Sequence, residues 1–155
     1  MDILQATTVA HLIGMVMFMG NLMISSVWKL SAERSKHPTL ICFALRQVAM
    51  TDLVFGAAGI SLMFFSGIVI ASMQGLSWSS SWLMGSSGLF ALACGLWLGV
   101  MVPVHARQKM MSIDIAAGRP IASRYWQLSW IWFIAAAASL CALFFGAYWM
   151  VSAPH

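Results

Sequence analysis

Charged side chains are scarce in this sequence. Its 155 residues include 8 Lys and Arg and 4 Asp and Glu, so that 8% of the chain is charged while 61% is hydrophobic. A soluble globular domain carries about 25% charged residues. So few charges cannot cover a water-facing surface. The scarcity therefore excludes an ordinary soluble domain and indicates that lipid surrounds most of the chain.

Polar residues seldom interrupt the long apolar runs of the sequence. Four runs reach the roughly 20 apolar residues that a helix needs to cross a bilayer. We place these spans at about residues 9–28, 53–73, 82–104 and 126–151. The chain, residues 1–155, is therefore predicted to be one all-α integral membrane domain, a four-transmembrane-helix bundle. Residues 29–52 and 105–125 are predicted as cytoplasmic loops, in which Thr39–Met50 could extend the second span as one long helix after Pro38.

Basic residues are missing from every segment except the two predicted cytoplasmic loops. All eight lie in these loops, at Lys29, Arg34, Lys36, Arg46, Arg107, Lys109, Arg119 and Arg124. The positive-inside rule then places both loops in the cytoplasm and both termini outside, a topology written N-out/C-out. The net charge of +4 is thus a signal of topology, with anionic lipids at the cytoplasmic face as partners. It does not indicate binding to nucleic acid.

Cysteines are too few and too scattered for a metal knuckle. Cys94 and Cys141 lie near mid-membrane, where packing explains a small polarisable residue better than redox use does. The motifs of soluble enzymes are missing too. There is no G-x-S-x-G, no phosphate-binding glycine loop and no pair of carboxylates within the spans.

A small-residue pattern occurs in the third span. Gly95 and Gly99 form a GxxxG arrangement, and the fourth span carries small residues at Ala135–Ala138. Such residues let two helix backbones approach closely in lipid. The pattern predicts close packing of these two spans, or a contact with another protein.

Two histidines are candidates for a membrane site, His11 inside the first predicted span and His105 at the inner end of the third. His11 lies 18 residues before Lys29, about 27 Å at 1.5 Å per residue, so it is expected one or two turns below the outer surface. His105 is two residues from Arg107, at the inner surface. The two histidines are roughly 20 Å apart along the membrane normal, and ligands of one iron lie within about 4 Å of each other. They cannot share a metal. His11 is either a ligand in the outer half or a histidine hydrogen-bonded to a neighbouring helix.

Methionines follow His11 at four-residue steps. Met15, Met19 and Met23 continue one stripe along the same helix face. Methionine commonly fills irregular apolar gaps, so packing is the simpler interpretation. A path for Cu(I) along His11, Met15 and Met19 is the alternative.

Asp52 is the acidic residue at the inner mouth of the second span. Arg46 and Asp52 are six residues apart, about 240° around a helix, and do not pair directly. We expect ion pairing at the inner mouth that involves Asp52 and a cation from a neighbouring span, namely Lys29, Arg107 or Arg124. A role in proton or substrate binding is the alternative.

Several of these positions together resemble a known pattern. They are His11, Gly20-Asn21, Arg46, Asp52, Phe55, Gly59, Gly67, Trp82 and Pro103. The pattern is similar to that of a family of predicted bacterial integral membrane proteins (domain of unknown function 2269) and covers most of the chain. That family distantly resembles the HemJ-type protoporphyrinogen oxidases and the CopD-like copper proteins.

The resemblance implies a cofactor. In the HemJ type, a histidine early in the first span is implicated in binding haem b, so the resemblance makes His11 the expected axial ligand. HemJ-type proteins also carry a lysine soon after a Trp-Leu start of the third span. Here Trp82-Leu83 is followed by Met84-Gly85. This departure argues against the oxidase activity itself and leaves haem binding as the expectation.

Three functions are compatible with these features. The first is a protein of the bacterial inner membrane that binds haem b through His11, with Met15 and Met84 beside it, and serves in redox chemistry or electron transfer near the outer face. The second is a non-catalytic subunit or anchor of a larger complex or homo-oligomer, suggested by the GxxxG pattern. The third is Cu(I) handling by the stripe of the first span.

Overall fold

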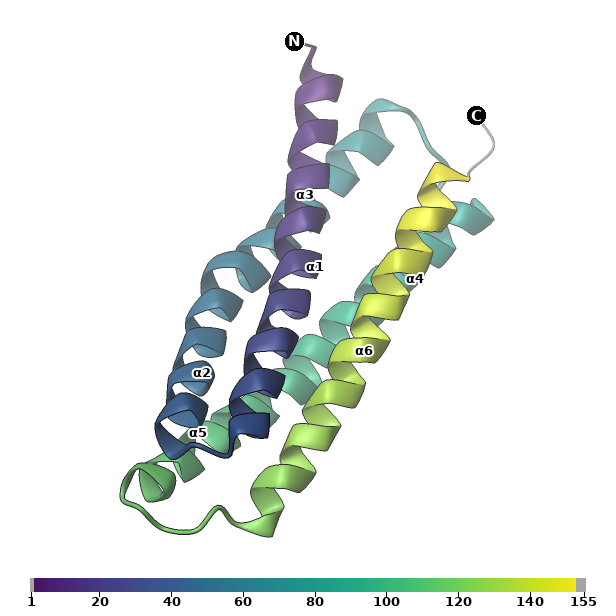
Figure 1. The fold of residues 1–155 in the computed structure, drawn as a ribbon. Helices are drawn as coiled ribbons and strands as arrows, with labels where there is room; N and C mark the ends of the chain where they lie inside the picture. Colours follow the sequence, from purple (N-terminus) through teal and green to yellow (C-terminus); the bar gives the residue numbers. More distant parts are fainter. Residues whose placement is uncertain (1, 153–155) are drawn as a thin grey trace.

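The computed structural model describes residues 2–152, and this part of the chain consists of helices joined by short loops (Figure 1). Helix α1 is Ile3–Ser35. The second long helix consists of α2 (Pro38–Thr51), the π-helical turn η1 (Asp52–Ala57) and α3 (Ala58–Met73). The third consists of α4 (Ser81–Leu96), the π-helical turn η2 (Trp97–Met101) and α5 (Val102–Ala116), and α6 is Ser123–Val151. All four are long and apolar enough to cross a membrane. The predicted four-helix membrane bundle is confirmed.

We call the end of the bundle that carries the basic residues the inner end, and the half that holds the termini the outer half. The helices continue past the predicted spans at the inner end. Helix α1 runs to Ser35 and α2 begins at Pro38, so the predicted extension of the second span over Thr39–Met50 is confirmed. Helix α5 runs to Ala116, through half of the predicted loop 105–125. The hydropathy of the sequence identifies only the part of each helix that faces lipid. These inner segments stay helical because one face of each is buried against other helices of the bundle, as with Ile41 and Leu45 of α2 and Gln108 of α5.

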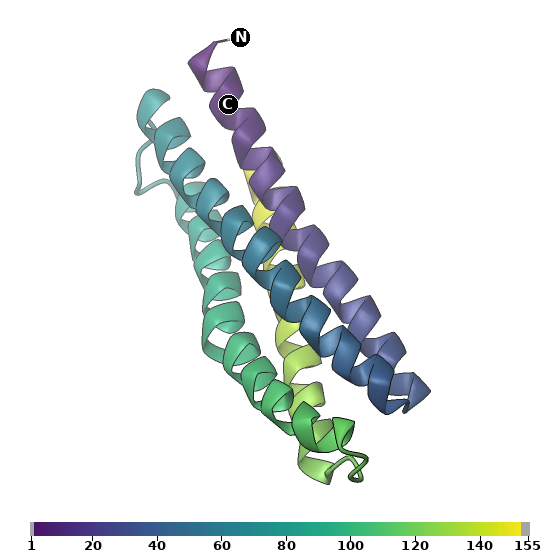
Figure 2. The same ribbon diagram turned by 90° about the vertical axis from the view of Figure 1, so that its left-hand side faces the viewer.

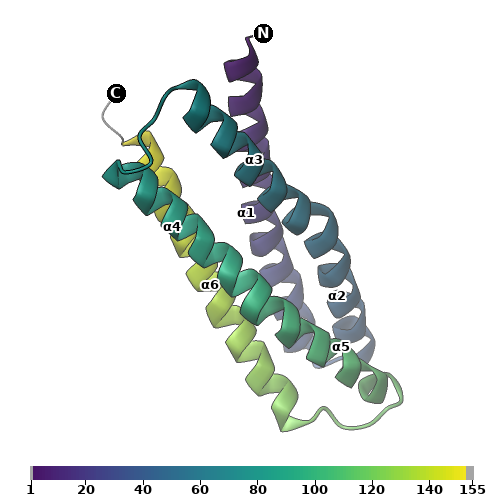
Figure 3. The same ribbon diagram turned by 180° about the vertical axis from the view of Figure 1, so that it is seen from behind.

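The helices associate in two pairs that meet at one end. Helix α1 packs along α3, and α4 packs along α6. At the inner end α2 joins them, with contacts from α1 to α2, from α2 to α5 and from α5 to α6, while α4 makes no comparable contact with α1 or α3 in residues 2–152. Figures 1 and 3 show the two pairs apart in the outer half, with the start of α1 and the end of α6 at the same end.

The closest approach of α1 and α3 occurs at two glycines. A Cβ atom added at Gly14 would lie 2.8 Å from the backbone nitrogen of Met63 and 2.9 Å from the carbonyl oxygen of Gly59. A Cβ atom at Gly59 would lie 2.8 Å from the backbone nitrogen of Phe18. The two backbones therefore touch, which only glycine allows. Figure 2 shows these helices side by side.

The distribution of side chains suits a lipid environment. The outward faces of all four long helices carry large apolar residues, among them Val16, Leu53, Phe65, Leu98, Ile134 and Phe145. The interior holds an apolar core that includes Phe18, Leu22, Val48, Met101 and Trp132. It also holds several polar side chains, including Asn21, Lys29, Asp52, His105 and Gln108. Apolar exteriors and polar interiors are expected where hydrocarbon replaces water.

The GxxxG pattern does not face the fourth span. Gly95 and Gly99 are exposed, and a Cβ atom at either would meet nothing within 4 Å. Helix α4 packs on α6 through Leu83, Ser86 and Ala93. Ala93 and Gly95 are about 200° apart around the helix, so burying one exposes the other. The predicted close packing of the third and fourth spans is confirmed, since α4 packs along α6. The predicted role of Gly95 and Gly99 in this packing is wrong, and their face of α4 is open to another chain.

Candidate functional site

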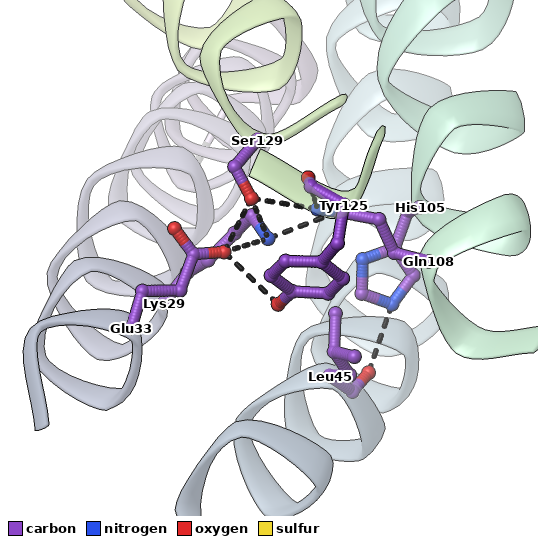
Figure 4. A network of polar contacts seen from close by, with 7 residues as sticks. All are labelled: Lys29, Glu33, Leu45, His105, Gln108, Tyr125 and Ser129. Atoms are coloured by element: carbon purple, nitrogen blue, oxygen red, sulfur yellow. Dashed lines mark hydrogen bonds and ion pairs between the residues drawn. The ribbon is translucent and has the colours of Figure 1, made fainter. Parts of the chain in front are cut away.

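Five side chains form an inner polar network at the end where the helices converge (Figure 4). Lys29 of α1 donates from Nζ to Glu33 Oε1 at 2.6 Å and to Gln108 Oε1 at 2.9 Å. Tyr125 of α6 donates from its hydroxyl to the same Glu33 oxygen at 3.0 Å, and Ser129 of α6 also donates to it. The network therefore ties α1, α5 and α6 together through one buried ion pair.

Every donor of the inner polar network has an acceptor. The ammonium group of Lys29 has three protons and three partners, Glu33, Gln108 and Ser129. The amide of Gln108 donates to Ser129 Oγ at 2.7 Å and to the carbonyl oxygen of Tyr125 at 3.3 Å. A buried network whose donors all have acceptors stabilises one arrangement of the helices. Its role is structural.

Aromatic rings enclose the buried cation. Nζ of Lys29 lies 5.4 Å from the ring centre of Tyr125, 5.7 Å from that of Trp132 and 5.9 Å from that of Phe133. Lys29 is 1% exposed, so its ammonium group faces the interior of the bundle and is not available to lipid headgroups. The spacing of Lys29 and Glu33, four residues apart on one helix face, was the signal that could have identified this pair.

His105 is part of the inner packing. Its Nε2 donates to the carbonyl oxygen of Leu45 on α2 at 2.8 Å (Figure 4), and its Nδ1 is buried without a hydrogen-bond partner in the described part of the chain. The ring thus joins α5 to α2. It lies at the inner end, whereas His11 contacts α3 in the outer half, as the depth argument required.

The ion pairing predicted at the inner mouth is not formed. Asp52 accepts a hydrogen bond from the Asn21 amide at 2.7 Å and has no cation within salt-bridge distance in residues 2–152. Lys29 is already bound to Glu33, and the side chains of Arg46 and Arg107 are exposed. Arg124 is also exposed. The prediction failed because Asp52 lies beside Asn21. Asn21 is two turns of α1 farther from the inner surface than Lys29.

His11 lies between α1 and α3, half-buried. Its Nδ1 is 3.0 Å from Oγ of Ser66. The Ser66 hydroxyl proton is already directed at the backbone carbonyl oxygens of Leu62 and Met63. A hydroxyl group has one proton, so we assign that proton to the carbonyl contacts, and Ser66 Oγ then accepts from Nδ1 of His11. In this assigned tautomer Nε2 presents a lone pair.

The surroundings of His11 are partly as the sequence predicted. The ring packs on Gly67, where an added Cβ atom would lie 3.3 Å from Cε1 of His11. Met15 packs against the apolar core, one turn along α1 from His11. Met84 is exposed on α4, a helix that makes no extensive contact with α1 or α3. The structure does not bring Met84 to His11.

The methionine stripe turns away from His11. Met15 and Met19 lie against the apolar core, while Met23 is exposed toward lipid. Their thioethers therefore do not converge on one point, which favours packing over a Cu(I) path. Within residues 2–152 no group of three or more His, Cys, Asp and Glu side chains could hold a metal ion. A metal at His11 would have a single protein ligand of these types.

Comparison with known proteins places the chain in a family. The family model described as "Predicted integral membrane protein (DUF2269)" matches residues 5–154. The chain belongs to this family. No curated protein and no solved structure matches it. The family description agrees with the four spanning helices and supplies no activity, so the argument for a function depends on the side chains.

Proposed function

We propose that this protein is a redox or electron-transfer protein of the bacterial inner membrane that binds haem b through Nε2 of His11 in its outer half. One observation carries the proposal: Nδ1 of His11 lies 3.0 Å from Ser66 Oγ, and the tautomer that we assign from this contact leaves Nε2 with a lone pair. Histidines that bind metals almost always donate their other N–H to a fixed acceptor in this way. The resemblance of the His11 position to the haem-binding histidine of the HemJ type supports the same ligand.

The residues around His11 fit one axial bond. Haem, when bound, would supply one-electron chemistry, and the chain would supply the imidazole and an apolar environment. Met84 would not contribute to holding the group, since it is exposed on a separate helix pair. Because the outer half has no Lys or Arg, the carboxylates of a haem would have to face the outer aqueous surface near Ser77–Ser81.

An optical spectrum tests the proposal. The full chain is expressed with a haem supply and purified in mild detergent, and the spectrum is recorded before and after dithionite. We expect a Soret band that is lost in His11→Ala and kept in His37→Ala, where the replaced histidine is exposed at the start of α2. A protein that purifies without the band, or a band that persists in His11→Ala, contradicts the proposal.

A second candidate function rests on the open face of α4. We propose, as an alternative to the redox role, that the protein is a subunit or anchor held by Gly95 and Gly99, which have nothing within 4 Å. Replacement of both glycines by Ile would then abolish co-purification of a partner or a second copy at fixed stoichiometry. Gly20→Ile is the matched control, since Gly20 also faces open space on α1. A monomer in native mass measurements of the original chain contradicts this candidate.

The inner end offers a surface for lipid headgroups. Seven of the eight basic residues have exposed side chains there, at Arg34, Lys36, Arg46, Arg107, Lys109, Arg119 and Arg124. We propose that they bind anionic lipids of the cytoplasmic leaflet. Arg119 is in part neutralised by Asp114, at 2.7 Å.

A further inference from the structure

A carboxyl group lies near the middle of the bundle without a cation. Asp52 is 8% exposed and is the fifteenth residue of the long helix Pro38–Met73. Its partner Asn21 lies near the middle of α1. Transfer of a carboxylate from water into such a place is unfavourable unless a counter-charge or several donors support it. Ionisable residues at membrane depth are therefore functional candidates.

Two N–H donors are directed at this carboxyl group. The Asn21 amide donates to Oδ1 at 2.7 Å. The indole of Trp97, on η2, faces the same carboxyl group. Trp97 is 6% exposed, and its buried N–H makes no hydrogen bond of standard geometry in the described part of the chain. The Asn21 amide is thus hydrogen-bonded to Asp52, and the indole N–H of Trp97 is available to it. This arrangement suits a carboxyl group that changes between a neutral and a charged form.

Both long helices depart from regular geometry at this place. The π-helical turn η1 begins at Asp52, and η2 begins at Trp97. They lie against each other, because a Cβ atom at Gly56 would be 3.0 Å from the Trp97 ring and 3.4 Å from the Asn21 amide nitrogen. Single π-helical turns inside α-helices occur frequently at functional sites. Here two of them face one buried acid.

Polar groups connect this acid only toward the inner end. Below Asn21 on α1, Ser25 lies 3.4 Å from both Asn21 Oδ1 and Thr51 Oγ1. Toward the outer end, Phe18 stacks edge-on against Trp97, with ring centres 6.0 Å apart, and the touching backbones of α1 and α3 follow. The groups that follow the acid toward the outer end are therefore apolar.

We propose that Asp52 is an intramembrane proton-binding site that exchanges with the cytoplasmic side alone. A proton from water at the inner end binds the free carboxylate oxygen and forms the acid, which keeps the bond from Asn21. When the proton returns to water on the same side, the carboxylate accepts from both Asn21 and Trp97. No electron moves, and no ligand other than the proton is required.

The other charged and titratable groups near this site are bound to a partner or exposed. On α1 they are Lys29 and Glu33, which are paired with each other. The nearest charged residue on α2 is Arg46, which is exposed. The nearest titratable residue on α5 is His105, which is hydrogen-bonded to Leu45. Toward the outer end, α1 carries His11, and α3 has no charged residue.

Infrared difference spectra between acid and alkaline pH test the proposal. The full chain in detergent should show a band of a protonated carboxyl group that disappears at alkaline pH. The band should be lost in Asp52→Asn and kept in Asp114→Asn, whose acid is exposed on the inner loop. Trp97→Phe removes the donor that supports the carboxylate, so the pH midpoint of the band should rise by about one unit. A band that is absent, or that persists in Asp52→Asn, overturns the proposal.

The sidedness has its own test. In proteoliposomes with uniform orientation, the pH is changed on one side of the membrane only. The Asp52 band should follow the pH on the side of the basic loops and ignore the other side. A response to the side of the termini overturns the one-sided connection. Neither experiment involves haem, so failure here is independent of the result at His11.

Discussion

The inner polar network and the His11 site hold ionisable side chains in the same bundle but use them differently. At Lys29 every proton has an acceptor and every nearby amide and hydroxyl is engaged. At His11 one ring nitrogen is fixed by Ser66, and the other keeps its lone pair. The comparison shows that burial alone does not distinguish a structural group from a ligand-binding one. The two sites differ in whether the ionisable group keeps a donor or acceptor atom that has no hydrogen-bond partner.

The arrangement of the helices explains this difference. At the inner end α1, α2, α5 and α6 converge, so three helices can supply partners to one cation. In the outer half α1 contacts α3 alone, and α4 with α6 forms a separate pair (Figure 3). A polar group there has one neighbouring helix from which to draw partners. Incomplete satisfaction is the expected result.

Removal of the buried cation should have the largest effect. Lys29→Met leaves Glu33 buried with no cation, so we expect a loss of about 3–5 kcal/mol in the free energy of unfolding. The measurement is denaturant unfolding in detergent, followed by tryptophan fluorescence. Arg34→Met, an exposed cation one turn farther along α1, should cost little. Equal losses in the two variants would show that the network does not hold the inner end together.

A methyl group at the α1–α3 contact should have the next largest effect. Gly59→Ala places a Cβ atom 2.8 Å from the backbone nitrogen of Phe18, so the helices must separate. We expect a loss of about 1–3 kcal/mol in the same unfolding measurement. Gly95→Ala meets open space and should be neutral or slightly stabilising. If Gly59→Ala unfolds like the original chain, the close approach is not present.

Loss of the group that orients the imidazole should weaken haem binding about tenfold. Ser66→Ala removes the acceptor of the His11 Nδ1 proton and leaves His11 itself in place. Titration of the haem-free protein with haem, followed at the Soret band, gives the affinity. Ser61→Ala, on the same helix, removes a hydroxyl that bonds only to its own helix and should leave the affinity unchanged. Equal affinities of both variants and the original chain would remove Ser66 from the site.

The smallest effect is expected at Met84. This side chain was predicted near the cofactor, but it is exposed on the separate pair of helices. Met84→Leu should therefore leave the reduced and oxidised spectra unchanged. A shift of the reduced spectrum in this variant would mean that the two helix pairs close over the haem, contrary to the structure.

The sequence predicted the features that depend on hydropathy and on the distribution of charge. The four spanning helices and the helical extension over Thr39–Met50 follow from apolar length and from Pro38. The separation of His11 from His105 follows from their distances to Lys29 and Arg107 along the chain. These quantities require only the rise of a helix and the position of the inner surface.

The features that depend on which face of a helix turns inward could not be predicted. A soluble helix shows its buried face by its apolar residues, but a helix in lipid is apolar on every side. The partner of Asp52 and the orientation of Gly95 were therefore wrong. The inward face of α1 was readable from its polar residues alone, since Asn21, Ser25, Lys29 and Glu33 recur at four-residue steps.

The tautomer of His11 in the haem-free protein tests the central claim most directly. Nitrogen NMR of histidine-labelled protein resolves protonated and unprotonated ring nitrogens, and His11→Ala identifies the His11 signals among the four histidines. At neutral pH we expect a protonated Nδ1 and an unprotonated Nε2. A proton on Nε2 would contradict the account, because no lone pair would then face outward from Ser66 to receive a metal.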